Sequence, residues 1–173
     1  MKINSEKNTF SKLFDVSRET LTKLIQYELK IISFNEKSNI IGKSTIPHIW
    51  KRHFADSAKI LSFITTILKK KENRKLTICD VGSGAGFPGL VILILNQEKK
   101  VNFHMTLVES NKKKCSFLKD LIKCFKIKAE VINDRAENLN KKFDIIIARA
   151  VAPLSKFMVF CRNIRKDKTI YIL

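Results

Sequence analysis

Glycines that alternate with other residues follow an acidic residue near the middle of the chain. Asp80 comes directly after a short apolar run, Gly82, Gly84 and Gly86 occupy every second position after it, and Pro88 continues the alternation. Glycine lets the backbone adopt positive φ and lets a ligand approach without meeting a Cβ atom. Proline suits a first helical turn, where its missing N–H is not needed. The stretch therefore predicts a strand, a ligand-binding turn and a helix, in that order.

The spacing of the glycines discriminates among three kinds of nucleotide site. A dinucleotide fingerprint, G-x-G-x-x-G, would need glycine at Phe87, and a phosphate-binding P-loop would need lysine where Leu90 follows Gly89. What remains is D-x-G-x-G-x-G, in which Asp80 would repel a pyrophosphate but attract an ammonium group. S-adenosylmethionine carries such a group on its methionine half. We therefore expect S-adenosylmethionine as the cofactor, bound by the loop residues Asp80, Gly82, Gly84 and Gly86.

A second carboxylate closes the next apolar run. Glu109 ends a predicted strand, 20 residues after Gly89. A carboxylate at this place can accept hydrogen bonds from both hydroxyls of a ribose. Alternatively, Glu109 caps the following helix, where a negative charge is favourable. We expect the ribose contact.

Two more predicted strand ends carry residues suited to a site. Asn133–Glu137 lies where a sheet of this kind would meet an adenine ring, although an ordinary polar loop explains it equally well. Arg149 lies between Ala148 and Ala150, with no histidine nearby to act as a base and no Asn-Pro-Pro-aromatic or Pro-Cys motif. The acceptor would then be an atom that loses no proton, such as guanine N7, and catalysis would be mostly alignment of the reactants. Arg149 would position them, or would be a structural charge.

Polar and basic residues elsewhere could contact a substrate. His53, Asp56 and Ser57 share one helical face at i, i+3 and i+4, a spacing that makes poor nucleophile–base geometry. We expect a polar patch near the mouth of the cofactor site, with a capped, buried histidine as the alternative. Three consecutive lysines occupy a predicted helix N-terminus, which is unfavourable for cations unless a phosphate backbone lies nearby; compositional bias would also explain them. These lysines are Lys112, Lys113 and Lys114.

The elements that position these residues follow from hydrophobic periodicity. Residues up to about 70 show apolar positions three and four apart, which predicts helices, with Ser17 as a cap, a connection at 34–42 and a second helical segment after Pro47. Strands are predicted at 76–81, 101–109, 129–132, 143–148 and 169–173, and helices after the glycine loop, at 112–125 and at 153–164. Alternating strands and helices indicate an α/β fold with a mostly parallel sheet and helices on both faces. We divide the chain into a helical extension, 1–70, and an α/β core, 71–173, within one compact unit.

Composition narrows the class of partner. The chain has 173 residues and a formal net charge of +18, which favours a polyanionic partner, nucleic acid before an acidic membrane surface. A lysine-rich, AT-rich coding bias would explain part of this charge. The four cysteines form no metal-binding pattern, so we expect reduced thiols and no metal site. No apolar run reaches the roughly 20 residues of a membrane span, and the start lacks a signal-peptide core. We expect a cytoplasmic monomer that does not bind membranes.

With these residues in place, the chain resembles the bacterial small-subunit ribosomal RNA guanine-N7 methyltransferases, the glucose-inhibited division protein B family. The resemblance covers nearly the whole chain, and the motifs that carry it are Asp80–Leu90, Val108–Lys114 with Phe117-Leu118, Arg135–Glu137, Ala148–Ala150, Phe34–Asn39 and Arg52–Ser57. It implies a class I S-adenosylmethionine-dependent methyltransferase with a Rossmann-like fold that modifies N7 of one guanosine in the decoding-region loop of 16S rRNA. By the same resemblance Gly82, Phe87, Ala136, Glu137 and Arg149 would contact S-adenosylmethionine, and Glu109 would bind its ribose.

One departure from the family pattern affects the expected activity. Members of the family continue past the fifth strand through a glycine turn, a helix and a β-hairpin, whereas this sequence stops at Leu173. We therefore expect the C-terminal strands to be missing and the fifth strand to be an uncovered edge. Two other functions stay open: a catalytically impaired RNA-binding remnant of the family, and an NAD-dependent oxidoreductase.

Overall fold

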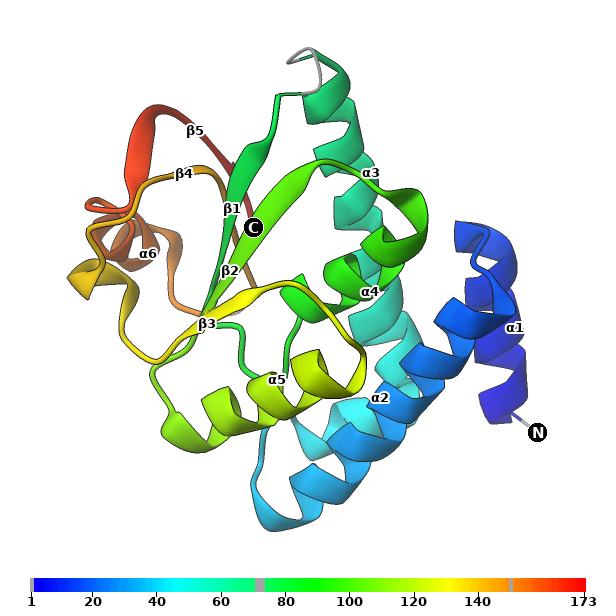
Figure 1. Cartoon of the computed structure of the whole chain (residues 1–173). Coiled ribbons are helices and arrows are strands. Elements are labelled where there is room, and N and C mark those ends of the chain that lie inside the picture. Colours follow the sequence, from blue (N-terminus) through cyan, green and yellow to red (C-terminus); the bar gives the residue numbers. More distant parts are fainter. Residues whose placement is uncertain (1, 71–73, 150) are drawn as a thin grey trace.

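A five-stranded parallel sheet forms the centre of the molecule in the computed structural model, which describes residues 2–70, 74–149 and 151–173 (Figure 1). The strands are β1 (Leu76–Val81), β2 (Phe103–Val108), β3 (Glu130–Ile132), β4 (Phe143–Ala148) and β5 (Arg165–Ile172). Their order is β3-β2-β1-β4-β5, and the neighbouring pairs are parallel. Because the chain leaves β1 toward β2 on one side and reaches β4 on the other, a topological switch point lies at the carboxyl end of β1.

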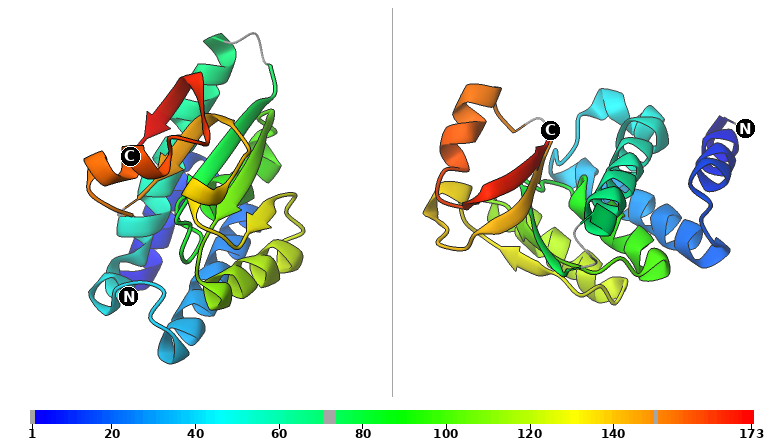
Figure 2. Two further views of the ribbon diagram at one scale, coloured as in Figure 1. Left: turned by 90° about the vertical axis from the view of Figure 1, so that its left-hand side faces the viewer. Right: turned by 90° about the horizontal axis from the view of Figure 1, so that it is seen from above.

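Helices cover both faces of this sheet (Figure 2). The N-terminal part consists of α1 (Lys2–Phe14), α2 (Arg18–Lys37), the short segments η1 (Lys43–His48) and η2 (Trp50–Ala55), and α3 (Asp56–Lys70). The helices between strands are α4 (Gly89–Lys99), α5 (Lys112–Cys124) and α6 (Leu154–Phe160), and a single turn, η3 (Ala136–Asn138), precedes β4. α3 and α4 pack on one face, while α6 lies on the opposite face (Figure 2). The α/β fold with helices on both faces is confirmed.

The strands bury alternate residues in two separate cores. From β1, Leu76 and Ile78 belong to the core beneath α3 and α4, whereas Cys79 and Val81 belong to the core beneath α6. Successive side chains of a strand point to opposite faces, so a strand covered on both sides is apolar throughout. This is why β1 and β4 have the bounds that their apolar runs predict, 76–81 and 143–148.

The helical predictions were less accurate at three places. The predicted connection at 34–42 begins only at Ser38, because Asn35 is buried within α2 and its Oδ1 accepts hydrogen bonds from the N–H groups of Ile40 (2.8 Å) and Ile41 (3.0 Å). The second helical segment does not start as an α-helix after Pro47, since 3₁₀ and π turns precede α3. The predicted helix at 153–164 ends at Phe160, and its last residues form turns that lead into β5.

The N-terminal helices share their core with the sheet. Tyr27 of α2 is fully buried, and its hydroxyl donates to the carbonyl of Ala85 in the glycine loop. Its ring lies 5.5 Å from the rings of both Phe54 and Phe87. Residues 71–73, at the predicted division between extension and core, lie outside the described residues. The division stays a prediction, but one continuous core of buried side chains spans both parts.

Candidate active site

The glycine loop lies at the switch point, between the carboxyl end of β1 and the start of α4. Gly82 has φ +69° and its N–H donates to the carbonyl of Val108 at the end of β2 (2.8 Å). A Cβ atom at Gly82 would lie 2.7 Å from a methyl group of Val151, and the left-handed φ also disfavours a side chain, so both features favour glycine here. Gly86 has φ +101° and packs against Tyr27 and Leu90, which makes it a packing position and not part of a cavity wall.

Asp80 lies beneath the loop. Its Oδ2 accepts hydrogen bonds from the N–H of Gly89 (3.0 Å) and from the hydroxyl of Ser83, whereas Oδ1 has no partner. Burial raises the pKa of this carboxyl to about 6, although the bonds from Ser83 and Gly89 act in the opposite direction. The side chain is fully buried, so its visible role is to hold the loop to the start of α4. The predicted contact with an ammonium group stays a prediction, and Oδ1, the oxygen without a partner, is itself buried.

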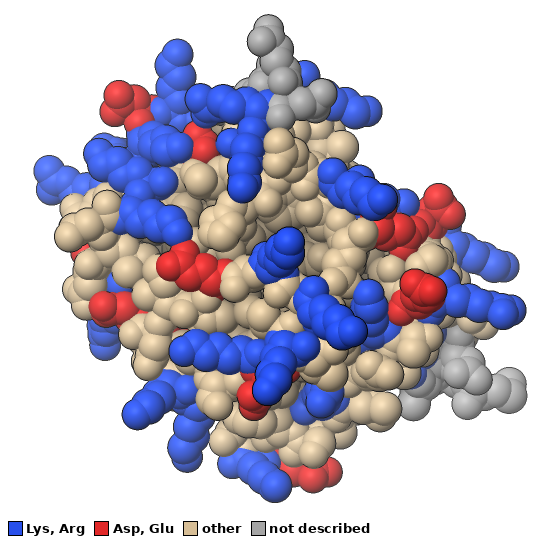
Figure 3. Space-filling model, in the orientation of Figure 1, with Lys and Arg blue, Asp and Glu red and all other residues tan. Residues whose placement is uncertain are grey.

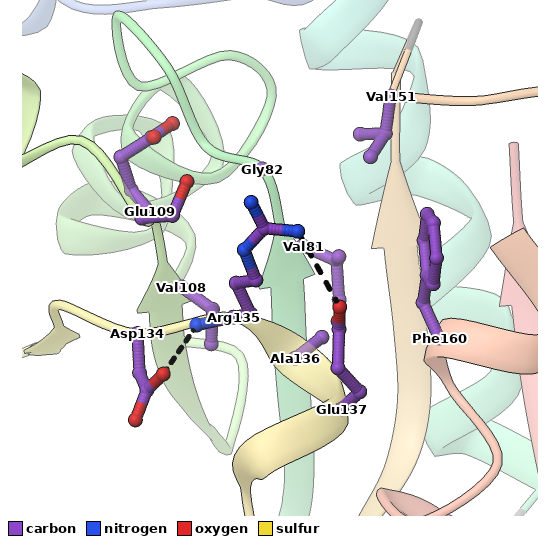
Figure 4. A pocket seen from close by; sticks show the side chains of 11 residues that line it. Val81, Gly82, Val108, Glu109, Asp134, Arg135, Ala136, Glu137, Val151 and Phe160 are labelled. Carbon is purple, nitrogen blue, oxygen red and sulfur yellow. Dashed lines mark hydrogen bonds and ion pairs between the residues drawn. The ribbon is translucent and has the colours of Figure 1, made fainter.

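On one side of the loop lies a cavity of about 240 Å³, here called the acid-lined cavity (Figure 4). Its wall includes Gly82, Glu109, Asp134, Arg135, Ala136 and Glu137. Glu109 is buried, and its Oε2 and Oε1 accept main-chain hydrogen bonds from Gly84 (2.9 Å) and Asn111 (2.8 Å). Each carboxylate oxygen has a second lone pair, so Glu109 can still accept from a ligand. The predicted cofactor residues Glu109, Ala136 and Glu137 are thus brought to one cavity from two loops.

Arg135 reaches across the acid-lined cavity. Its guanidinium lies between Glu109 and Glu137 in Figure 4 and points toward Gly82, with an ion pair to Glu137 at 3.9 Å. The Asp134 carboxylate accepts from the Arg135 N–H (2.7 Å) and from the Asn138 amide (2.7 Å), which orders the turn after β3. The acids of this cavity therefore surround a single arginine among the described residues that line it.

On the other side of the loop lies a cavity of about 400 Å³, here called the cation-lined cavity. Gly82 lines both cavities, and Gly84 lines this one. The cation-lined cavity also brings together side chains from four distant parts of the chain: Arg52, His53, Asp56, Phe87, Lys114 and Arg149. Together the two cavities fall within the range of roughly 300–1,000 Å³ that is usual for small-ligand sites.

Phe87 and His53 hold Arg149 at this cavity. The His53 ring stacks on Phe87 with centroids 4.7 Å apart, and the Arg149 guanidinium lies 5.3 Å from the same phenyl ring. Arg149 also hydrogen-bonds His53 Nδ1 and donates to the carbonyl of Arg52 (3.0 Å). Burial lowers the pKa of Arg149, but an arginine stays protonated in a protein, so the cavity keeps a fixed cation at its wall.

Some predicted substrate residues lie elsewhere. Ser57 is fully buried and its hydroxyl donates to the carbonyl of His53 (2.6 Å), so it supports the helix and does not line the cavity. Lys112 and Lys113 are exposed at the start of α5, which Asn111 caps, and of the three lysines Lys114 alone lines the cavity. Ala150 lies outside the described residues.

Sequence reasoning missed residues that the fold brings into the site from far away. Thr45 and Arg52 line the cation-lined cavity, and Tyr27 supports the glycine loop from below. No local pattern marks Thr45 or Tyr27, because their partners lie in other segments. Arg52 lies beside the predicted polar patch and lines the cavity, and its carbonyl also accepts from Arg149, a contact that no residue type could indicate.

Positive charge is spread over the surface. Lys and Arg side chains outnumber Asp and Glu on the face shown in Figure 3 and are not gathered in one patch. Within the described residues no group of three or more His, Cys, Asp or Glu is arranged for a metal ion. The part of the chain that the structure describes also has no helix with the length and apolarity needed to cross a bilayer.

Known proteins resemble this chain in both sequence and fold. It is 38% identical over 161 residues to a ribosomal RNA small subunit methyltransferase G from Bartonella tribocorum, covering 91% of this chain and 71% of that protein. The protein of the same name from Bartonella henselae is 46% identical over 96 residues, which cover 56% of this chain and 40% of that protein. The matched parts of the chain thus span between 40% and 71% of these two relatives.

A solved structure shows the same fold. Magnesium protoporphyrin IX methyltransferase from Synechocystis PCC 6803, solved with bound S-adenosylmethionine, superposes with a TM-score of 0.56 over 82% of this chain and 69% of that one, at 13% identity. The fold is therefore that of a class I S-adenosylmethionine-dependent methyltransferase. The family model described as rRNA small subunit methyltransferase G (GidB) matches residues 20–173. With its glycine loop, flanking cavities and parallel sheet, this chain belongs to the GidB family of rRNA small subunit methyltransferases.

Proposed function

We propose that this protein transfers a methyl group from S-adenosylmethionine to N7 of a guanosine in 16S rRNA. Family membership gives the class of reaction. The structural observation that carries the proposal is the meeting of two cavities of opposite charge at Gly82, directly above the carboxyl end of β1. Ligands of open α/β sheets bind at this kind of switch point.

The acid-lined cavity fits the adenosine half of the cofactor. Adenosine is uncharged but rich in donors, namely the two ribose hydroxyls and the adenine amino group. Carboxylates are the acceptors that match such donors. Glu109 would accept from the ribose diol of the cofactor, and Ala136 and Glu137, in the same cavity, would contact its adenine ring. A side chain at Gly84 would meet no protein atom closer than 3.7 Å, so the space above the loop is open to a ligand.

The cation-lined cavity fits the methionine half and the RNA. Arg149 offers a fixed positive charge to the methionine carboxylate. Lys114 and Arg52, at the same cavity, suit the phosphates that flank a target nucleotide. Asp56 is the single acid among the described residues that line this cavity.

The residues present suit an acceptor that loses no proton. When bound, S-adenosylmethionine supplies a methyl group on a positively charged sulfur, which a guanine N7 lone pair can attack directly. Both ring nitrogens of His53 are already engaged, Nδ1 by Arg149 and Nε2 by Thr45 (2.9 Å), so this histidine is not free to act as a general base. Phe87 and Arg149 therefore contribute by holding the reactants in line, which can lower a barrier by several kcal/mol.

Transfer of label from tritiated S-adenosylmethionine tests the proposal. Naked 16S rRNA and small ribosomal subunits that lack the modification serve as alternative substrates, and reduction followed by strand scission locates N7-methylguanine. We expect label in a single guanosine. Binding of rRNA and S-adenosylhomocysteine without transfer would instead support an impaired RNA-binding protein. A change in NADH fluorescence on binding, with no heat on titration with S-adenosylhomocysteine, would support an oxidoreductase and contradict the proposal.

The partners beyond rRNA stay predictions. We infer that the protein acts as a cytoplasmic monomer, which sedimentation of the full chain with and without small subunits would test. A stable dimer in the absence of RNA would contradict this inference.

A further inference from the structure

A chain of hydrogen bonds connects the end of β4 to the N-terminal segment η1. Arg149 donates through Nη1 to the carbonyl of Arg52 (3.0 Å) and through Nη2 to His53 Nδ1. His53 Nε2 lies 2.9 Å from the hydroxyl of Thr45, and that hydroxyl lies 2.7 Å from the carbonyl of Gly42. The chain thus joins groups that are more than 90 residues apart in sequence, and it runs along the wall of the cation-lined cavity.

The chemistry of the groups fixes the direction of every bond. A guanidinium can only donate, so His53 Nδ1 must accept from Arg149. A carbonyl can only accept, so the Thr45 hydroxyl donates to Gly42 and must accept from His53 Nε2. The imidazole is therefore neutral, with its one proton on Nε2. No other arrangement of protons satisfies all of these bonds at once.

The surroundings favour the same neutral form. Burial lowers the pKa of His53 to about 4, and the charge of Arg149 acts in the same direction. The ring is half-buried and stacks on Phe87. Charged side chains lie beside this ring or line the same cavity: Arg52, Asp56, Lys114 and Arg149. Three of them are cations, which disfavour an imidazolium, and Asp56 is the one that opposes them.

We propose that His53 is a positioning residue for Arg149. As a neutral acceptor whose ring is held by Thr45, it keeps the guanidinium over Phe87 at the wall of the cation-lined cavity. The proposal for His53 depends on the proposed function only because the ligand of Arg149 is taken to be S-adenosylmethionine. Arg149 would otherwise lose its side-chain acceptor at the cavity wall and keep only the carbonyl of Arg52. Thr45 does not contact Arg149 but accepts from His53 Nε2, so it helps to hold the imidazole ring in place.

Three variants and a control separate this role from simple packing. His53→Phe keeps an aromatic ring against Phe87 but removes the nitrogen that accepts from Arg149. His53→Asn keeps an acceptor oxygen near the position of Nδ1. Thr45→Val removes the hydroxyl group with little change in the shape of the side chain. His48→Asn is the matched control, since His48 is largely exposed and does not line the cavity. The measurements are the affinity for S-adenosylhomocysteine by calorimetry, KM and kcat with rRNA, and the melting temperature.

We expect His53→Phe to weaken S-adenosylhomocysteine binding about 10-fold or more, because a hydrogen bond to a charged group is lost. His53→Asn should recover most of this affinity, Thr45→Val should fall between the two, and His48→Asn should match the wild type. KM for S-adenosylmethionine should rise in the same order as the loss of affinity. Unchanged affinity in His53→Phe, or an equal loss in His53→Phe and His53→Asn at equal melting temperature, would overturn the proposal.

Nitrogen-15 spectra of the histidine ring give a test that needs no ligand. In the wild type we expect the neutral tautomer with the proton on Nε2 between pH 5 and 8, and in Thr45→Val the same tautomer, because Nδ1 still accepts from Arg149. An imidazolium or an Nδ1–H tautomer at pH 7 in the wild type would overturn the positioning role. Failure of the wild type to bind S-adenosylhomocysteine would count against the proposed function, while the spectra would still decide the state of His53.

Discussion

The two cavities beside the glycine loop share a wall at Gly82 but differ in charge. The acid-lined cavity has Glu109, Asp134 and Glu137 around one arginine, whereas three cations of the cation-lined cavity surround one acid, Asp56. A ligand that spans both must therefore present donors to one side and anionic groups to the other. This difference in charge indicates that the site not only binds an asymmetric cofactor but also determines which end of it enters which cavity.

The largest effect is expected where a side chain would enter the space above the loop. Gly84 has φ +57° and no neighbouring atom within 3.7 Å of a Cβ position. Gly84→Val should reduce the affinity for S-adenosylhomocysteine on the order of 100-fold, because the side chain would occupy ligand space, and should cost about 1–2 kcal/mol of stability from the left-handed backbone. Ser62→Val, at an exposed position of α3 that lines neither cavity, is the control for calorimetry. Unchanged affinity in Gly84→Val would contradict the loop assignment.

Glu109→Gln tests the acid-lined cavity alone. The amide keeps one acceptor oxygen but loses the charge and the second acceptor, so affinity for S-adenosylhomocysteine should fall about 10- to 100-fold. Binding of rRNA, measured by filter retention, should not change. Glu36→Gln, at an exposed position on α2, should alter neither quantity. A loss of rRNA binding in Glu109→Gln would mean that the two cavities do not divide the ligands in this way.

Lys114→Ala tests the other cavity. Because a lysine that contacts a phosphate contributes to binding mainly through counterion release, KM for rRNA should rise several-fold and the salt dependence of binding should weaken by about one unit of slope. The affinity for S-adenosylhomocysteine should stay as in the wild type. Lys75→Ala, at the opposite end of the sheet, is the matched loss of one charge. An equal effect of the two substitutions would indicate that rRNA is attracted by the net charge of +18 in general, and not by a contact of Lys114 at the site.

Substitution of Asp144 should change no ligand affinity at either cavity, although it should lower the stability of the protein. Asp144 accepts hydrogen bonds at the amino ends of the strands from Thr77 N–H (3.0 Å), the Thr77 hydroxyl (2.7 Å), Lys166 (2.9 Å) and Arg74 (2.9 Å). Burial alone would raise the pKa of Asp144, but these bonds lower it to about 2. Asp144→Asn should cost about 1–3 kcal/mol in urea unfolding at pH 7 and leave ligand affinities unchanged.

The pH dependence of this contribution follows from the direction of the shift. A carboxyl whose folded pKa is depressed stabilises the protein fully above its unfolded pKa, near 4, and loses that contribution as pH falls through about 2. The stability difference between wild type and Asp144→Asn should therefore shrink between pH 4 and 2. A constant difference over this range would show that the charge of Asp144 is not what stabilises the strands.

Much of the fold could be predicted from the sequence because the signals are local. The bounds of β1 and β4 follow from apolar runs that end in glycine or polar residues, and the loop follows from its glycine spacing. The π turns at Trp50–Ala55 could not be predicted, since no residue type marks them. Of the three residues expected on one helical face here, His53 and Asp56 line the cavity, whereas Ser57 is buried.

The site was only partly predictable for a related reason. Each strand end could be identified separately, but not which strand ends share a cavity. Nothing local indicates that Arg149 meets His53, 96 residues away in sequence. Arg149 reaches the glycine loop because the order β3-β2-β1-β4-β5 places the end of β4 beside that of β1.

The contact between Tyr27 and Ala85 has a consequence for how the molecule unfolds. Burial raises the pKa of Tyr27 well above its ordinary value, so its hydroxyl remains a donor, and its ring packs among Phe54, Phe87 and Phe125. A ligand that orders the loop must then also slow hydrogen exchange in α2, although it touches no atom of that helix. We expect helices and sheet to melt in one transition, and S-adenosylhomocysteine to shift that transition as a whole.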